Sequence, residues 1–191
     1  MALPMAGPGK LDGKLDEPYW ARAAPAALAA GKDAPNPLGR KAAVRFLRSP
    51  THLLVGAHLT RGDQTAWDLR IALDTDRDAT TAWEMRCDTD GERSVELVSR
   101  HGLRASLDRK TVQIQARKLP DAYTFELAIP LSALGVNVRR AGQWNVQVTA
   151  ESWDQGRQAT LRLAPAVDGY DRMHHWAVLK APPAALPNES E

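Results

Sequence analysis

Alternation of apolar and polar residues with a period of two is the feature that most constrains what this chain can fold into. The alternation extends from about Lys41 to Lys180 and is longest in residues 67–74, 123–129 and 144–151. In each of these runs, one face collects apolar side chains and the other collects charged, amide or hydroxyl side chains. Because successive side chains of a β-strand point to opposite faces, the pattern predicts strands with one buried face.

Shorter runs follow the same rule, and turn-forming residues separate them. They cover residues 44–47, 53–59, 83–88, 95–98, 112–116, 160–163 and 176–179. Asp90 and Gly91 predict a type I′ hairpin turn, because both residues tolerate a positive φ. We therefore predict an all-β fold, an antiparallel β-sandwich or jelly roll of about ten strands.

Two segments outside these runs are expected to differ. Residues 130–135 have the signature of a single helical turn, with Pro130 suited to its start and Gly135 to its end. Residues 21–30 have a helical composition, but Pro25 interrupts them. That interruption predicts an irregular or briefly helical segment.

Composition limits the partners of such a sandwich. The chain has 25 Lys and Arg against 23 Asp and Glu, so it lacks the strong positive charge of most nucleic-acid-binding proteins. Its longest apolar runs are far shorter than the roughly 20 residues that cross a bilayer. The single cysteine, Cys87, excludes an internal disulfide and a cysteine-built metal cluster, and we expect an inert buried thiol.

The chain is expected to form one folded domain over residues 10–180. Residues 1–9 have neither the positive charge nor the apolar stretch of a signal peptide, and they are interpreted as a disordered or tag-like N-terminus. Residues 181–191 are proline-rich and acidic, which is typical of a tail or linker. A linker at that end predicts a larger multidomain parent protein.

The polar faces of the predicted strands are rich in side chains that make two hydrogen bonds at once. Arg70, Glu84, Arg86, Asn145 and Gln147 all fall on them. Planar guanidinium, carboxylate and amide groups match the neighbouring hydroxyls of a sugar. The alternative from patterning alone is a polar sheet face that contacts only water.

A sugar-binding face also needs exposed aromatic rings, because the C–H face of a sugar stacks on them. Four of the six tryptophans fall on apolar faces or in the N-terminal segment and are expected in the core: Trp20, Trp83, Trp144 and Trp176. Trp67, Trp153 and Tyr170 lie beside polar loops. These three are the rings that we expect at a binding site.

Several segments match motifs of one family. They are the opening KLDGKLDEPYW of residues 10–20, VRFL of 44–47, LLVGA of 53–57, the run 67–74, DTDG of 88–91, FELAIP of 125–130 followed by Leu134 and Gly135, and WNVQV of 144–148. Together these segments resemble the family 9 carbohydrate-binding modules and the wider sugar-binding group related to them. The similarity extends over nearly the whole of residues 10–180.

The resemblance implies a jelly-roll sandwich that binds a polysaccharide or oligosaccharide without cleaving it. Family members hold a saccharide end between two tryptophans; by position, Tyr170 replaces one, and the other falls near Gln64, with Trp67 three residues later. The strand positions that would contact hydroxyls carry Arg70, Glu84 and Arg86, whereas Asn145 and Gln147 keep the amide pattern. These residues, with Trp153, form the predicted ligand site.

The resemblance also implies calcium. Asp74, Asp76 and Asp78 place three carboxylates at alternate positions, a spacing that can surround a hard cation with oxygen ligands. The segment lacks the glycine and distal glutamate of an EF-hand loop, and Arg77 in its middle opposes cation binding. A solvated acidic turn is the alternative.

Three functions from different classes remain open on the sequence. The first is a non-catalytic carbohydrate-binding module of a bacterial protein, outside the cell or in the cell envelope, with a cytoplasmic location as the alternative. The second is a protein-interaction or structural sandwich without sugar affinity. The third is a haem-binding electron-transfer domain, in which Met85 and either His174 or His175 would supply ligands. Glu126 and Glu151 are two carboxylates of the kind that a glycosidase uses, but nothing in the sequence marks them as catalytic. We therefore expect that the chain is not an enzyme.

Overall fold

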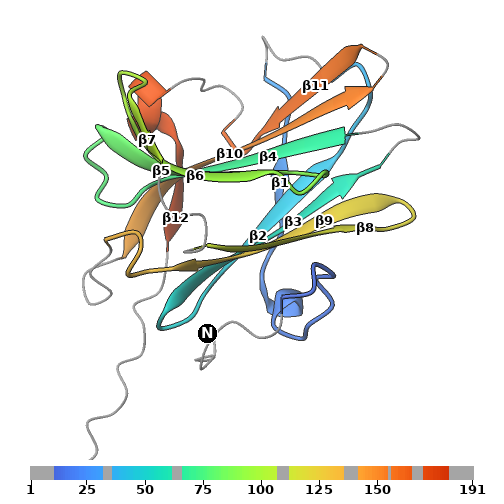
Figure 1. The fold of residues 1–191 in the computed structure, drawn as a ribbon, viewed down its shortest axis with the longest axis horizontal. Coiled ribbons are helices and arrows are strands. Elements are labelled where there is room, and N and C mark those ends of the chain that lie inside the picture. The colour runs from blue at the N-terminus through green and yellow to red at the C-terminus, as the bar shows by residue number, and fades with distance from the viewer. Residues whose placement is uncertain are drawn as a thin grey trace, which may run out of the picture.

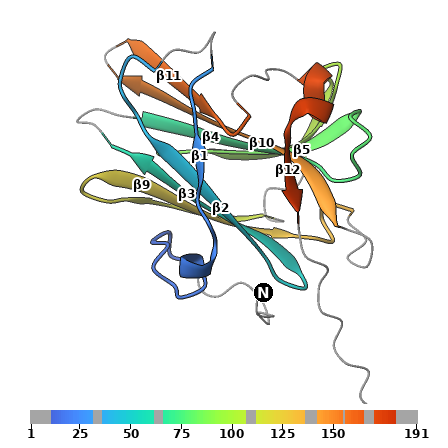
Figure 2. The same ribbon diagram turned by 180° about the vertical axis from the view of Figure 1, so that it is seen from behind.

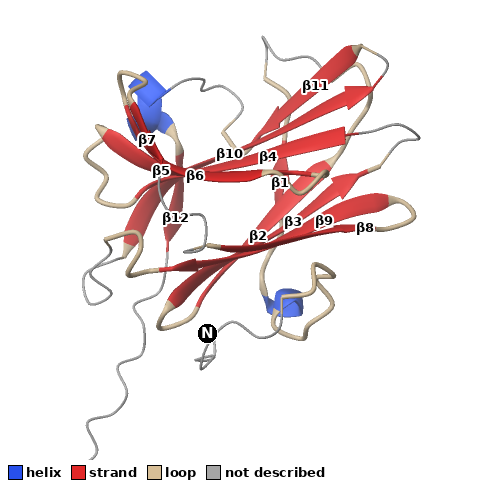
Figure 3. Ribbon diagram, viewed as in Figure 1, coloured by secondary structure: helices blue, strands red, loops and turns tan. Residues whose placement is uncertain are grey.

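Two antiparallel β-sheets face each other and enclose one hydrophobic core (Figure 1; Figure 3). This computed structural model describes residues 11–31, 36–61, 66–106, 112–135, 142–154, 156–164 and 170–180, and for 170–172 the backbone alone. The architecture confirms the predicted all-β antiparallel sandwich. The predicted boundary regions 1–9 and 181–191 lie outside the described residues.

The first sheet has five strands in the order β1-β2-β3-β9-β8. Their bounds are β1 (Ala26–Leu28), β2 (Ala42–Arg48), β3 (His52–Thr60), β9 (Ala122–Pro130) and β8 (Gln113–Lys118). Apart from β1, each of these strands coincides with a run of alternating residues. β1 has only three residues, too few to show an alternation in the sequence.

The second sheet has the order β11-β10-β4-β5-β6-β7, and β12 pairs with the start of β10. The bounds are β11 (Arg157–Arg162), β10 (Gln143–Asp154), β4 (Ala66–Asp74), β5 (Thr81–Asp88), β6 (Arg93–Ser99), β7 (Arg104–Ser106) and β12 (Ala177–Lys180). β7, again three residues long, was not predicted. In the described part of the chain, the helices are two short 3-10 segments, η1 (Trp20–Arg22) and η3 (Tyr170–His175), and neither has the length or apolarity to span a membrane.

The core lies between the inner faces of the two sheets. Trp144, Ile71, Phe125 and Leu127 are completely buried there. Trp20 and Trp176 are also buried, and Trp83 is half-buried against the core, so the four tryptophans predicted to be internal are confirmed. Burial of these side chains is the main stabilisation of the domain.

One edge of the sandwich is closed by backbone pairing between the sheets. β1 pairs with β2 in the first sheet, and the next residue, Ala29, bridges to Arg162 of the second sheet through two N–H···O bonds of 2.9 and 2.8 Å. Figure 2 shows β1 lying between the two sheets. The irregular segment predicted over residues 21–30 thus contains η1 and a short strand.

The N-terminal segment is held on the outer face of the first sheet by the buried Glu126 carboxylate. This carboxylate accepts hydrogen bonds from the backbone N–H of Asp12 (3.0 Å) and Gly13 (2.7 Å) and from Nε1 of Trp20 (2.8 Å). The LDG and tryptophan of the opening motif are therefore anchoring residues. Gly56 lies directly beneath, where a Cβ would come within 2.7 Å of Leu15.

Two local turn predictions have different outcomes. The β5–β6 turn is not type I′, because Gly91 has a φ of 91° while Asp90 is not among the residues with positive φ. The carboxylate of Asp88 instead accepts the N–H groups of Asp90 and Glu92, which fixes a different turn. The predicted turn at 130–135 is present, with i→i+3 bonds such as Ala133 N–H to Pro130 O at 3.0 Å.

Candidate functional site

The outer face of the second sheet carries a row of arginines between two rows of carboxylates. Residues directly opposite each other in antiparallel strands point to the same face. The central row across β11, β10, β4, β5 and β6 is Arg162, Thr149, Arg70, Arg86 and Ser94. The flanking rows contain Glu151, Asp68 and Asp88 on one side and Glu84 and Glu96 on the other. We call these ten residues, with Arg104, the charged face.

Close ion pairs hold Arg86 and Arg104 of the charged face. Arg86 Nη2 lies 2.5 Å from Asp68 Oδ2, and Arg104 pairs with both Glu84 and Glu96. The hydrogen bonds that these guanidinium groups donate to the carboxylates raise the pKa of Arg86 and of Arg104. The Asp68 and Glu84 side chains are only 4% and 3% exposed, so the carboxylates lie beneath guanidinium groups that remain open to solvent.

The charged face is bounded at both ends. Trp153, opposite Ala66 in the β4–β10 pair, extends the same face beyond Glu151 and is 38% exposed. At the other end, Met173 of η3 and Trp176 pack on Ala72 and Ala82. Figure 1 shows η3 above one end of this sheet and the β10–β11 hairpin at the other. The open stretch of the charged face lies between Trp153 and η3.

Arg70, Glu84 and Arg86 lie together on this face, as their phase in the sequence predicted. The prediction of exposure at Trp153 is also confirmed. Asp68, Glu96 and Arg104 were not predicted as site residues. Arg104 lies in the strand β7, which has three residues and is too short to show an alternation. Asp68 is in phase with Arg70 on β4, so the alternation would have placed it on the charged face.

The prediction of an exposed ring at Trp67 is wrong. Its side chain is completely buried on the inner face, and its Nε1 donates to Thr60 O at 3.0 Å. β4 begins at Ala66, so Trp67 is in phase with the core residues Leu69 and Ile71 rather than part of the preceding loop. Strand phase, not proximity to a polar loop, decides its direction.

Asn145 and Gln147, predicted as ligand-site residues, are not open to a ligand, which corrects a second prediction. Both are buried. Asn145 Nδ2 donates to Asp74 at 3.0 Å and its Oδ1 accepts from Arg77 Nε at 3.2 Å. The Gln147 amide pairs with the backbone N–H and C=O of Ala164 at 3.0 and 3.2 Å. Both amides satisfy polar groups of covering loops.

Tyr170 opens η3, which lies on the outer side of the second sheet, but its side chain falls outside the described part of the structure. The position of its backbone is on the same side as the charged face. Gln64, the family position near Trp67, also lies outside the described residues. A contact of Tyr170 with a ligand stays a prediction.

Asp74, Asp76 and Asp78 lie together in the β4–β5 turn, with one carboxylate oxygen of each within 4.8 Å of the others. This spacing and donor chemistry fit a hard cation such as calcium. The same carboxylates also close the turn. Asp74 accepts the N–H groups of Arg77 (2.7 Å) and Ala79 (3.2 Å), and burial raises the pKa of Asp74.

Met85 and the histidines of η3 lie on opposite faces of the second sheet. Met85 is completely buried on the inner face, whereas His174 and His175 are exposed on η3, which packs on the outer face. The two groups cannot ligate one haem iron, so that pairing is wrong.

Cys87 is buried, and burial raises the pKa of its thiol, which keeps it protonated, as expected of an inert cysteine. Glu126 and Glu151 belong to different sheets. Both carboxylate oxygens of Glu126 accept hydrogen bonds from the N-terminal segment, so these two residues do not form a pair of neighbouring carboxylates.

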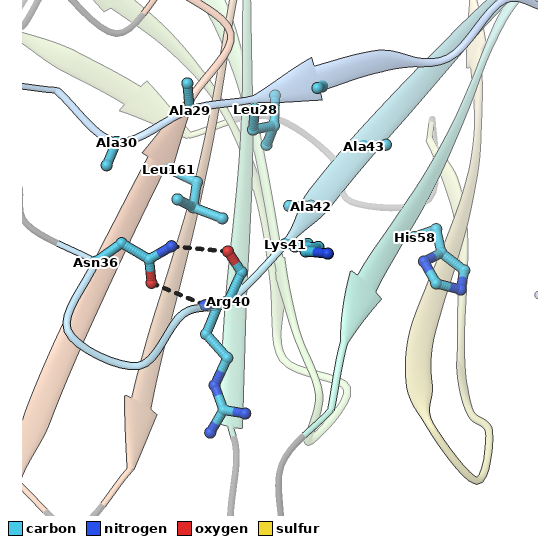
Figure 4. Close-up of a pocket in the computed structure, with 11 residues that line it drawn as sticks. Leu28, Ala29, Ala30, Asn36, Arg40, Lys41, Ala42, Ala43, His58 and Leu161 are labelled. Carbon is cyan, nitrogen blue, oxygen red and sulfur yellow. Dashed lines mark hydrogen bonds between the residues drawn. The ribbon is translucent and has the colours of Figure 1, made fainter.

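A hollow of about 340 Å³ lies where β1, the start of β2 and β11 meet (Figure 4). Its walls are mostly alanines with Leu28 and Leu161. Of its polar lining residues, Asn36 bonds to the backbone of Arg40, and the Arg40 guanidinium pairs with Asp154 at 2.7 Å; Lys41 and His58 also line the hollow. This hollow lacks the open donor and acceptor rows of the charged face.

Comparison with known proteins gives a match in fold. No protein-family model matches the chain, and no curated protein matches its sequence. A family 9 carbohydrate-binding module from Caldicellulosiruptor kristjanssonii in complex with cellotriose matches with a TM-score of 0.65 at 15% identity, covering 97% of this chain and 94% of that chain. A family 9 module from the same organism in complex with glucose matches with a TM-score of 0.63 at 16% identity, covering 98% of each chain.

A candidate carbohydrate-binding protein from Bacteroides uniformis ATCC 8492 matches with a TM-score of 0.59 at 12% identity, covering 83% of this chain and 85% of that chain. Each of the three matches covers most of this chain and most of the similar structure. This chain therefore has the fold of the family 9 modules, as the opening motif and the FELAIP segment led us to expect.

Proposed function

We propose that this chain is a carbohydrate-binding module without catalytic activity, and that the charged face between Trp153 and η3 binds an oligosaccharide or polysaccharide. The observation that carries the proposal is the charged face itself, with fixed guanidinium and carboxylate groups in alternate rows beside an exposed tryptophan. The fold shared with modules solved in complex with cellotriose and glucose supports it. A location outside the cell or in the cell envelope is part of the proposal.

The charged face offers the two kinds of partner that a sugar hydroxyl needs. Each hydroxyl donates one hydrogen bond and accepts others, and alternate rows supply carboxylate acceptors and guanidinium donors. Because ion pairs already hold Arg86 and Arg104 in place, little side-chain entropy is lost when a ligand binds. Adjacent rows are two residues apart along each strand, which is about 7 Å, so an acceptor row and a donor row can contact hydroxyls on opposite sides of one sugar ring.

Trp153 supplies the aromatic surface in this proposal. Its ring is 38% exposed at the end of β10 and is in phase with Glu151 and Thr149. Thr149 lies four positions before Trp153 on β10, which is roughly 13 Å at 3.3 Å per residue. An oligosaccharide stacked on Trp153 and lying along β10 reaches the arginine row. Tyr170 of η3 is proposed to contact its other end.

Isothermal titration calorimetry with cello-oligosaccharides and a panel of plant and bacterial glycans tests the proposal. We expect binding without hydrolysis, and Trp153→Ala should weaken it about fivefold to tenfold, since an aromatic contact contributes on the order of 1 kcal/mol. Leu103→Ala is the matched control, because Leu103 is an exposed apolar side chain in the β6–β7 turn, off the charged face. The absence of binding across the panel would favour a protein-interaction sandwich instead.

A further inference from the structure

We propose that the charged face prefers glycans with acidic sugars, and that Arg70, beside Arg86, binds the sugar carboxylate. This inference rests on the proposed function and adds the ligand class to it. It starts from three arginine side chains, Arg70, Arg86 and Arg104, which are 34%, 52% and 43% exposed. The carboxylates with which they pair lie lower, so the outermost charge of this part of the face is positive.

Arg70 and Arg86 are direct cross-strand partners in the β4–β5 pair. Like charges at such positions repel each other and destabilise a sheet. Arg86 is compensated by Asp68 at 2.5 Å. An anion between the two guanidinium groups would remove the remaining repulsion, which is a physical reason for a ligand to bind there.

Arg70 is the less neutralised of the two arginines. Its ion pair among the described residues is a 3.8 Å contact from Nε to Glu84 Oε2, whereas the other oxygen of Glu84 is held by Arg104 at 2.5 Å. The Nε of Arg70 is buried and makes no hydrogen bond within the described structure. No hydrogen bond of its terminal nitrogens is found among the described residues, and the side chain is 34% exposed, so these nitrogens can donate to a planar acceptor.

A carboxylate fits this arrangement better than a hydroxyl does. The guanidinium group presents two parallel N–H donors, and a carboxylate accepts both at once in a charge-assisted pair. Thr149 and Ser94 flank Arg70 and Arg86 in the same row, and both are half-buried, so their hydroxyls can contact the sugar ring. Glu151 lies on the Trp153 side of the row, where it would accept hydroxyls rather than an acid.

The test compares two oligomers of equal length that differ only at C6: a cello-oligosaccharide and a β-1,4-linked glucuronic acid oligomer. We expect calorimetry at low salt to show at least tenfold tighter binding of the glucuronic acid oligomer to the wild-type domain. Its affinity should fall as NaCl is added, because an exposed charge pair is screened. Arg70→Gln should bring the ratio of the two affinities close to one, and Arg70→Lys should retain part of the preference.

Arg22→Gln is the matched control, since Arg22 is an exposed arginine in η1, against the first sheet. It should keep the wild-type ratio, and thermal melts should show that all three variants are folded. Equal binding of both oligomers by the wild type, or an unchanged ratio in Arg70→Gln, would overturn the acidic preference and leave sugar binding intact. Binding of neither oligomer, nor of any other glycan, would overturn the proposed function itself.

Discussion

At the scale of single residues, buried polar groups hold the N-terminal segment in place. Glu126 is completely buried on β9 and accepts three N–H groups from residues more than a hundred positions earlier in the chain. A carboxylate suits this position because every neighbour is a donor. The Thr124 hydroxyl adds a further buried hydrogen bond to Gly13 O, but Glu126 accepts three of the hydrogen bonds that dock the segment on β9.

Replacing Glu126 should therefore destabilise the domain. Glu126→Gln places an amide N–H₂ among donors, and we expect the free energy of unfolding to fall by about 2–4 kcal/mol. Urea unfolding followed by tryptophan fluorescence measures it. Glu92→Gln, at an exposed turn position, is the control and should change stability by less than about 0.5 kcal/mol. Equal stabilities of the two variants would contradict the anchoring role.

Tyr19 links the stability of the same segment to alkaline pH. Burial, with the negative charges of Glu17 and Glu126, raises the pKa of Tyr19 from 10.0 to about 12. Because the unfolded chain loses this proton first, the free energy of unfolding should decrease as pH rises from 10 to about 12. Tyr19→Phe should lack that part of the decrease in urea midpoints measured across this range. Parallel pH profiles for variant and wild type would refute the prediction.

At the scale of elements, close approach between the N-terminal segment and β3 requires a glycine. A Cβ on Gly56 would lie 2.7 Å from Leu15 and 3.1 Å from the Trp20 ring. Gly56→Ala should lower the free energy of unfolding by about 1–3 kcal/mol, as overpacking does. Gly142→Ala is the control, since no atom lies within 4 Å of the added Cβ. Chemical denaturation should separate the two, and equal midpoints would argue against tight docking.

The β4–β5 turn is where calcium binding is predicted. The Asp74, Asp76 and Asp78 oxygens lie close enough for one ion, while Asp74 already accepts backbone N–H groups. A ligand that binds the folded state alone raises the melting temperature. We expect the melting temperature measured by calorimetry to rise with CaCl₂ and to fall back with a chelator. Asp76→Asn should abolish this rise. Superimposable melts in both solutions would refute calcium binding at this turn.

At the scale of the whole molecule, the two sheets depend on one shared core. Trp144 of β10 is completely buried and belongs to the cluster that includes Val55 and Phe125 of the opposite sheet. Trp144→Ala should lower the free energy of unfolding by about 3–5 kcal/mol, as loss of a core aromatic does. Trp153→Ala should lower it by only about 1 kcal/mol, because the Trp153 side chain is 38% exposed and lies outside the core. Denaturation followed by circular dichroism tests the contrast, which similar losses in both variants would contradict.

The sequence by itself determined the strands and their buried faces. Wherever an alternating run was long enough, as in 67–74, 123–129 and 144–151, the strand was found there and its apolar residues faced the core. The period of two is a local property of the backbone, so the sequence records it directly. The phase also placed Arg70, Glu84 and Arg86 on one face before their neighbours were known.

Only the tertiary structure decided which polar residues are accessible and which are covered. Asn145 and Gln147 have the same phase as Thr149, but the β4–β5 turn and the backbone at Ala164 cover them. Arg104 joins the charged face through a strand of three residues, which is too short to show an alternation in the sequence. Each outcome depends on contacts between segments distant in the chain, and a local alternation carries no information about such contacts.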